Sequence, residues 1–145
     1  METEMTELTL AEADAIAQGA IEGGILRGLN PIAVCVLDRG GHALVVKRQE
    51  AATFLRVEIA TAKAWTAVSL AAPSRNFAAM AETRPQFVTS LVTISQGRMA
   101  PAAGGVLVLR DGQVIGSVGV SGDTPDNDEA VALDGVSAAG LSSSE

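Results

Sequence analysis

The 145-residue chain contains few of the side chains that build common metal and nucleic-acid sites, with one cysteine, one histidine, one tryptophan, three phenylalanines and no tyrosine. A single cysteine excludes an internal disulfide and a cysteine-based zinc site. A single histidine excludes a two-histidine metal site within one chain. Basic residues are also scarce: the chain has ten Lys and Arg against seventeen Asp and Glu, which gives a net charge of −7. This balance and the scarcity of aromatic rings argue against partners such as nucleic acid or an anionic membrane.

Long apolar runs are absent as well. No stretch approaches the roughly 18 apolar residues of a spanning helix. The first seven residues are acidic overall, and no positively charged region followed by an apolar run occurs there, so the start of the chain does not resemble a signal peptide. We therefore expect a cytoplasmic protein with no membrane partner. The length and the 48% of apolar residues suit a single domain over 1–145, with an ordered core over about 8–140.

What is present is a regular alternation of helical and strand patterns. Thr9 and Glu12 form a capping box before apolar residues at helical spacing. Asp111-Gly112 between two β-rich runs is a strong hairpin signal. Together the patterns predict helices at about 10–27, 53–70, 74–80, 85–91 and 126–140, and strands at about 32–37, 42–48, 106–109 and 114–120.

The short connections between paired strands predict the fold class. Strands 32–37 and 42–48 are separated by a tight turn, as are the two later strands, so both pairs must be antiparallel hairpins. The intervening helices must then cover the faces of the sheet. The sequence therefore predicts a single three-layer α+β domain rather than a parallel Rossmann sheet.

Five segments resemble the motifs of one family. They are Asp38-Arg39-Gly40-Gly41-His42 followed by Arg48, Ala60-Thr61-Ala62-Lys63-Ala64-Trp65-Thr66-Ala67, the glycine-rich segments around 104–106 and 111–122, and Asp126-Asn127-Asp128-Glu129. They occur in the order seen in the GlcG/HbpS (heme-binding protein, DUF336) family, which is related to the C-terminal domain of PduO-type corrinoid adenosyltransferases. The resemblance covers about residues 8–140.

The resemblance implies more than the residue patterns do. It implies a profilin-like fold with about five antiparallel strands, and a short fifth strand near Met99-Ala100 would reconcile this number with the four strands predicted above. It also implies a homo-oligomer, either a dimer or a larger assembly. Some family members bind heme, which makes heme the candidate cofactor, while others are encoded beside catabolic enzymes for small molecules.

Two segments depart from the family pattern. Residues 48–52 read Arg-Gln-Glu-Ala-Ala where R-M-D-G-A is common, and residues 121–124 read Ser-Gly-Asp-Thr where S-G-G-T is frequent. The first change removes a glycine, and the second adds the carboxylate of Asp123. Both changes suggest a ligand different from that of the better-known members.

His42 carries the only imidazole. Imidazoles are common heme axial ligands and general bases, so His42 is a candidate for either role. A solvent-exposed histidine at the entry to a hairpin is the favoured interpretation, because such positions are usually open to water. The remaining candidate iron ligands are weaker, since Cys35 lies in an apolar strand and Met99 in an irregular stretch.

Lys63 lies on a largely apolar helix and needs a partner. A long cation among alanines must either reach solvent or pair with a carboxylate, and Asp38 and Asp128 are candidate partners. The ammonium could bind a substrate carboxylate or act as an electrophilic catalyst, or it could form a structural ion pair. The sequence leaves both alternatives open.

Glycine-rich turns and an acidic cluster surround the start of the last helix. Exposed amides at Gly104-Gly105 and at Ser121-Gly122 could hold an anion or a carbonyl oxygen. Carboxylates at 123, 126, 128 and 129 are explained by helix capping and the helix dipole. A hard-cation site there has low weight because the EF-hand spacing is absent, so no metal site is predicted.

Two functions remain. The first is a small-molecule-binding protein, with heme or another tetrapyrrole as the candidate ligand. The second is a cofactor-free catabolic lyase, isomerase or hydrolase acting on a small organic acid or carbonyl compound. The candidate catalytic residues are Lys63, Asp38, Asp123 and Glu129, and the candidate ligand-binding residues are Arg48, His42, Gly104, Gly105, Ser121 and Gly122.

Overall fold

The computed structural model describes residues 7–143, so both ends of the domain expected over 1–145 lie outside the described residues. Its centre is an open sheet whose strands are ordered β2-β1-β4-β3, with every neighbouring pair antiparallel. The two hairpins predicted from the sequence are confirmed, and β1 and β4 join them. The strands are β1 (Ala33–Asp38), β2 (Ala43–Arg48), β3 (Gly105–Arg110) and β4 (Gln113–Ser121).

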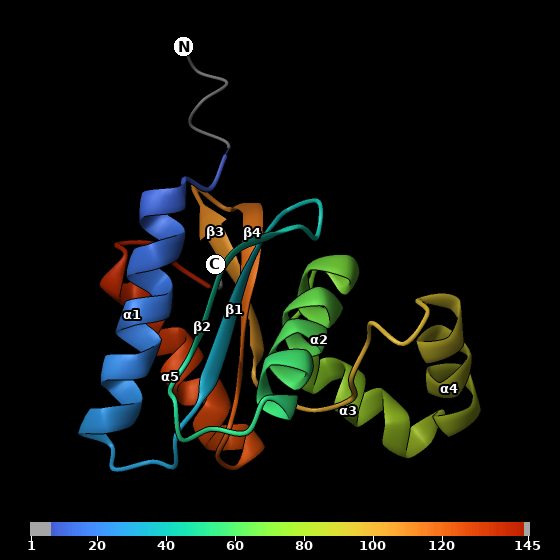
Figure 1. The fold of residues 1–145 in the computed structure, drawn as a ribbon. Coiled ribbons are helices and arrows are strands. Elements are labelled where there is room, and N and C mark those ends of the chain that lie inside the picture. Colours follow the sequence, from blue (N-terminus) through green and yellow to red (C-terminus); the bar gives the residue numbers. More distant parts are fainter. Residues whose placement is uncertain (1–6, 144–145) are drawn as a thin grey trace.

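Helices cover both faces of the sheet, which confirms the three-layer α+β prediction (Figure 1). Helices α1 and α5 lie side by side on one face, and α2 lies on the other. Helices α3 and α4 extend away from the sheet beyond α2. The helices are α1 (Leu10–Leu26), α2 (Leu55–Leu70), α3 (Ser74–Thr83), α4 (Pro85–Ile94) and α5 (Pro125–Ala138).

The alternation of side chains along β1 explains why its sequence is continuously apolar. Val34 and Val36 point into the core beneath α1 and α5. Cys35 and Leu37 point to the opposite face, where they meet alanines of α2 such as Ala64. Because both faces of this strand are buried, every position favours an apolar side chain.

The expectation of a fifth strand near Met99-Ala100 is wrong, because the sheet has four strands within residues 7–143. Met99 is instead buried in a small core with Phe77 and Val88. The amide of Ala100 donates to the hydroxyl of Thr66 at 2.9 Å rather than to a strand. Where the family resemblance implied a strand, the structure therefore has a loop that packs α3 and α4 against α2.

The capping box of α1 also ties this helix to the sheet. Arg110, at the end of β3, donates to both carboxylate oxygens of Glu12 at 2.8 and 3.0 Å. Chiefly through this contact, the pKa of Glu12 falls from 4.5 to about 2. The ion pair therefore stabilises the fold above the unfolded-state pKa, and its contribution is lost as the pH falls toward 2.

Glu12→Gln should consequently flatten the acid dependence of stability. We expect the free energy of unfolding of the native chain to fall more steeply between pH 5 and 2 than that of the variant, as measured by urea unfolding at a series of pH values. Glu22→Gln is the matched control, because Glu22 is an exposed residue of the same helix. If the free energy of unfolding falls equally with pH in the native chain and in Glu12→Gln, the Glu12–Arg110 ion pair is not the cause of the acid dependence.

Candidate functional site

The register of the sheet separates the predicted site residues into two groups at opposite ends of β1. Ala33 pairs with Ser121 at one end, and Asp38 pairs with Gly116 at the other. At about 3.3 Å per residue, the ends of this strand are roughly 17 Å apart. We call them the α5 end, where β4 leads into α5, and the hairpin end, where β1 turns into β2.

A buried ion pair lies at the α5 end. Lys63 is 3% exposed and Asp128 is 1% exposed, and their Nζ and Oδ2 atoms are 3.1 Å apart. The ammonium also donates to the carbonyl of Val120 at 3.0 Å. Burial lowers the pKa of Lys63, and the charge of Asp128 opposes that shift. Of the two partners predicted for Lys63, the structure places Asp128 there.

The Gly104-Gly105 turn packs directly on this lysine. A Cβ on Gly104, whose φ is +134°, would lie 2.8 Å from Lys63 Nζ, and one on Gly105 would lie 2.1 Å from the Lys63 carbonyl oxygen. The Gly105 amide donates to the hydroxyl of Ser74 at 2.8 Å. The two glycines thus allow β3 to approach α2 closely, and the Gly105 amide is occupied within the fold.

Asp123 forms hydrogen bonds that hold together the turns at the α5 end. Its carboxylate accepts from the amide of Asn30 at 3.0 Å and from the side chain of Asn127 at 2.7 Å. These bonds lower the pKa of Asp123, with the Asn127 side chain as the largest cause. The Asp123 amide donates to Asp128 Oδ1 at 2.9 Å, which links this turn to the buried ion pair.

Other predicted residues at this end also contact the fold. Arg48 Nη1 donates to the carbonyls of Glu50 at 3.1 Å and Ala52 at 2.5 Å. The hydroxyl of Ser121 accepts from Arg56 at 3.3 Å. A Cβ on Gly122 would lie 2.3 Å from the carbonyl oxygen of Pro31, in the loop before β1. Each of these three predicted ligand-binding residues therefore has a structural contact.

An acidic groove of about 470 Å³ runs between α3, the loop at 101–103 and the start of α5. Arg75 borders it and donates to Glu129 at 2.7 Å and to Asp126 at 2.8 Å. These two carboxylates raise the pKa of Arg75 above its ordinary value. With Glu82 also on the rim, the groove carries more negative than positive charge and disfavours an anionic ligand.

At the hairpin end, Asp38 organises the turn that carries the histidine. Its Oδ1 accepts from the amides of Gly40 at 2.9 Å and His42 at 3.0 Å. The same oxygen lies 3.4 Å from Nδ1 of His42, whose side chain is 82% exposed. The exposed histidine favoured from the sequence is confirmed. Within the described part of the chain, its Nε2 has no hydrogen-bond partner.

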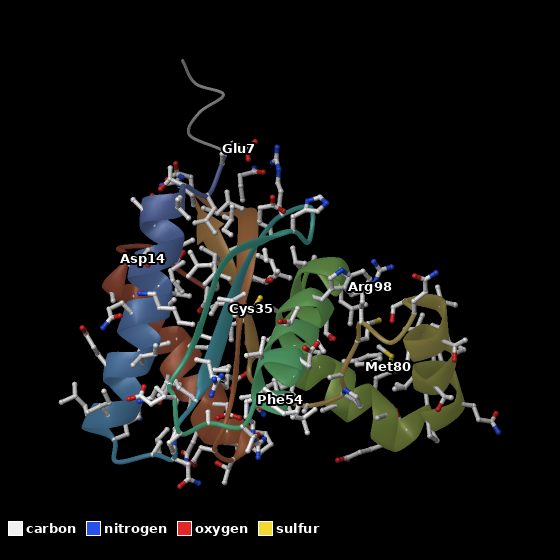
Figure 2. All side chains as sticks on the ribbon, in the orientation of Figure 1. Glu7, Asp14, Cys35, Phe54, Met80 and Arg98 are labelled. Atoms are coloured by element: carbon white, nitrogen blue, oxygen red, sulfur yellow. The ribbon has the colours of Figure 1, made fainter. Side chains whose placement is uncertain are left out.

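The turn borders a hollow on the side of α2 that faces away from the sheet. One part, of about 230 Å³, lies between Gly41 and Trp65, and a second part, of about 250 Å³, is lined mainly by apolar side chains. Trp65 and Arg98 border both parts, and we call the two together the α2-face hollow. Figure 2 shows Arg98 beside α2, near the arm formed by α3 and α4. The apolar part is lined by Leu70, Leu91, Ile94 and Met99.

The sequence did not identify Trp65 or Arg98 as site residues. Trp65 lies in the motif segment 60–67 but was assigned no role there, and its side chain is half-buried. Arg98 lies in an irregular stretch without a motif. Its guanidinium stacks over the Trp65 ring with 4.9 Å to the centroid. The available signal was that Trp65 is the only tryptophan in a chain that is poor in aromatic residues.

The two weaker candidate iron ligands are enclosed. Cys35 is fully buried between the sheet and α2, and this burial raises the pKa of its thiol (Figure 2). Met99 is 7% exposed at the floor of the hollow. Across residues 7–143, no group of three or more His, Cys, Asp or Glu side chains is arranged to hold a metal ion. None of the described helices is long and apolar enough to cross a membrane.

The fold defines the class of the protein: an α+β domain with one open antiparallel sheet between layers of helices. The family model described as "Haem degrading protein HbpS-like" matches residues 8–137. The chain therefore belongs to the HbpS-like family, and the resemblance found in the sequence is confirmed.

Known proteins of this family share both sequence and fold with the chain. It is 32% identical to the 15.0 kDa protein of the dhaT-dhaS intergenic region of Citrobacter freundii, over 89% of each chain. It is 29% identical to the corrinoid adenosyltransferase PduO of Salmonella typhimurium over 74% of its length, but this match spans only 32% of that longer protein.

Solved structures give the same result. The structure of the PduOC:heme complex has a TM-score of 0.85 at 25% identity and matches 96% of this chain and 99% of that one. The structure of HbpS has a TM-score of 0.79 at 32% identity, over 90% of this chain and 89% of that one. The Klebsiella pneumoniae protein ORFY has a TM-score of 0.84 at 29% identity, over 92% and 90%.

Proposed function

We propose that this protein binds heme or a related tetrapyrrole in the α2-face hollow. Two findings support a ligand of this kind: the description of the matching family names heme, and a similar fold has been solved as a heme complex. The observation that carries the location is the α2-face hollow itself. It places an apolar wall, an indole ring and a guanidinium beside the turn that holds the exposed imidazole.

The residues present fit the chemistry of heme. The apolar side chains at 70, 91 and 94 and the Trp65 ring suit a flat apolar macrocycle. His42 has Nε2 free for iron, while Asp38 lies beside its Nδ1 as a carboxylate that can orient the ring. Bound heme would supply an iron centre for redox or gas-binding chemistry.

Charge favours this hollow over the acidic groove. Heme carries two carboxylates, which the carboxylates of Glu82 and Asp126 would repel from the groove. Arg75 offers no compensating charge there, since it is already paired with two carboxylates. Arg98 in the α2-face hollow has no ion pair within residues 7–143 and can face an anion.

The catabolic enzyme alternative has no support from the family comparisons. Its catalytic set also does not converge, because Asp38 lies at the hairpin end whereas Lys63, Asp123 and Glu129 lie at the α5 end. Those three α5-end residues are engaged in ion pairs or hydrogen bonds within the fold. A cytoplasmic location and assembly into a homo-oligomer remain predictions.

Titration with hemin tests the proposal. We expect a Soret band to develop and saturate at one hemin per chain. Ile94→Asp should weaken binding about tenfold, because it removes apolar contact and places a negative charge beside the ligand. Ile94 is 72% exposed, so its replacement should leave the fold intact.

Ile25→Asp is the matched control, because Ile25 is 63% exposed on α1, across the sheet from the hollow. It should bind hemin as the native chain does. Absence of a saturable Soret band would refute heme binding. Equal affinity in Ile94→Asp and Ile25→Asp would refute the location.

A further inference from the structure

We infer that Arg98 is the anion-binding residue of the α2-face hollow and selects flat apolar ligands that carry a carboxylate at one edge. This inference rests on the proposed function and adds a specificity determinant to it.

Arg98 is held in place but is not neutralised. Its Nε donates to the carbonyl of Ser95 at 2.8 Å, and its guanidinium stacks over Trp65 at 4.9 Å. Neither Nη nitrogen donates to a described residue, and no carboxylate in residues 7–143 forms an ion pair with it. Arg48, Arg56 and Arg84 also form no ion pair with a described residue, but of these four cations only Arg98 borders the hollow.

The arrangement suits a carboxylate better than a point anion. A guanidinium offers parallel N–H groups that match the two oxygens of a carboxylate. The bond to Ser95 and the stacking on Trp65 orient this group before any ligand arrives, which lowers the entropic cost of binding. The ligand's apolar body would then lie along the apolar part of the hollow.

A second charged residue of the hollow, Glu58, favours one orientation of the bound ligand. Glu58 is exposed and borders the part of the hollow beside Gly41. Its carboxylate repels a ligand carboxylate from that part and leaves Arg98 as the favoured contact. The hollow thus discriminates between an acid and its uncharged ester, which share the same apolar body.

The chain contains a matched control. Arg84 also stacks on an aromatic ring, with its guanidinium 4.1 Å from the centroid of Phe87. Neither Arg84 nor Phe87 borders the two parts of the hollow. Arg84→Gln therefore removes an equivalent stacked cation at a position where no ligand contact is expected.

The test compares hemin with its dimethyl ester on the full chain, using Soret titrations. We expect the native chain and Arg84→Gln to bind hemin about tenfold more tightly than the ester. Arg98→Gln should weaken hemin about tenfold, leave the ester unchanged and so abolish the preference. Arg98→Lys should retain part of the preference, because it keeps the charge but loses the paired N–H groups.

Three results would overturn the inference. If Arg98→Gln keeps the preference for hemin, another residue binds the carboxylate. If Arg98→Gln weakens both ligands equally, Arg98 acts through the packing of Trp65. If Arg84→Gln loses the preference as well, the effect is one of overall charge. A native chain that binds neither ligand would instead refute the proposed function.

Discussion

Lys63→Met will lower the free energy of unfolding by about 3–5 kcal/mol, because it leaves the Asp128 carboxylate buried without its counter-charge. The two groups are 3.1 Å apart and almost completely enclosed. Methionine retains most of the lysine stem, so the loss will come from the charge rather than from a cavity. Urea unfolding monitored by circular dichroism measures the effect.

A double-mutant cycle separates the ion pair from its surroundings. Asp128→Asn keeps an oxygen that can accept from the amide of Asp123, but it removes the negative charge. The Lys63→Met/Asp128→Asn variant should recover much of the stability lost in Lys63→Met, since no unpaired charge remains. If Lys63→Met were as stable as the native chain, the structural account of this pair would be wrong.

His42→Ala will weaken hemin binding by about 100-fold or more and shift the Soret band. The expected loss is large because altering a residue that merely orients a metal ligand already costs roughly 10–100-fold in affinity. The imidazole is 82% exposed, so the replacement should leave stability nearly unchanged. Hemin titration and thermal unfolding of the same samples measure both quantities.

Asp38→Asn is the companion variant. It preserves an oxygen that can accept from the amides of Gly40 and His42 but removes the charge 3.4 Å from Nδ1. We expect a smaller loss of affinity than in His42→Ala, without a change of axial ligand. An unshifted Soret band in His42→Ala would exclude His42 as the iron ligand.

Most of the fold could be predicted from the sequence because its signals are local. The capping box at Thr9 and the turn at Asp111-Gly112 each determine a boundary through short-range geometry. The fifth strand was expected from the family rather than from such a signal. At Met99 the chain instead buries an apolar side chain with Phe77, which is a tertiary contact that local periodicity does not reveal.

The candidate site was harder to predict because it depends on register and on distant segments. Sequence motifs grouped Asp38 with Lys63, whereas antiparallel pairing sends Asp38 to the far end of β1. Of the two partners predicted for Lys63, the position of α5 selects Asp128, whose carboxylate lies 3.1 Å from the ammonium. The α2-face hollow could not be predicted from the sequence, because Trp65 and Arg98 come into contact only when the loop after α4 packs against α2.

The most direct test of the central claim is to locate a bound porphyrin. Zinc protoporphyrin can be titrated into ¹⁵N-labelled protein and followed by amide and indole NMR, where the one tryptophan gives one indole resonance. Binding in the α2-face hollow predicts saturating shifts at the Trp65 indole and at the amides of Gly41 and Gly97. Shifts confined to Ala79 and Asp126 would place the ligand in the acidic groove and contradict the account.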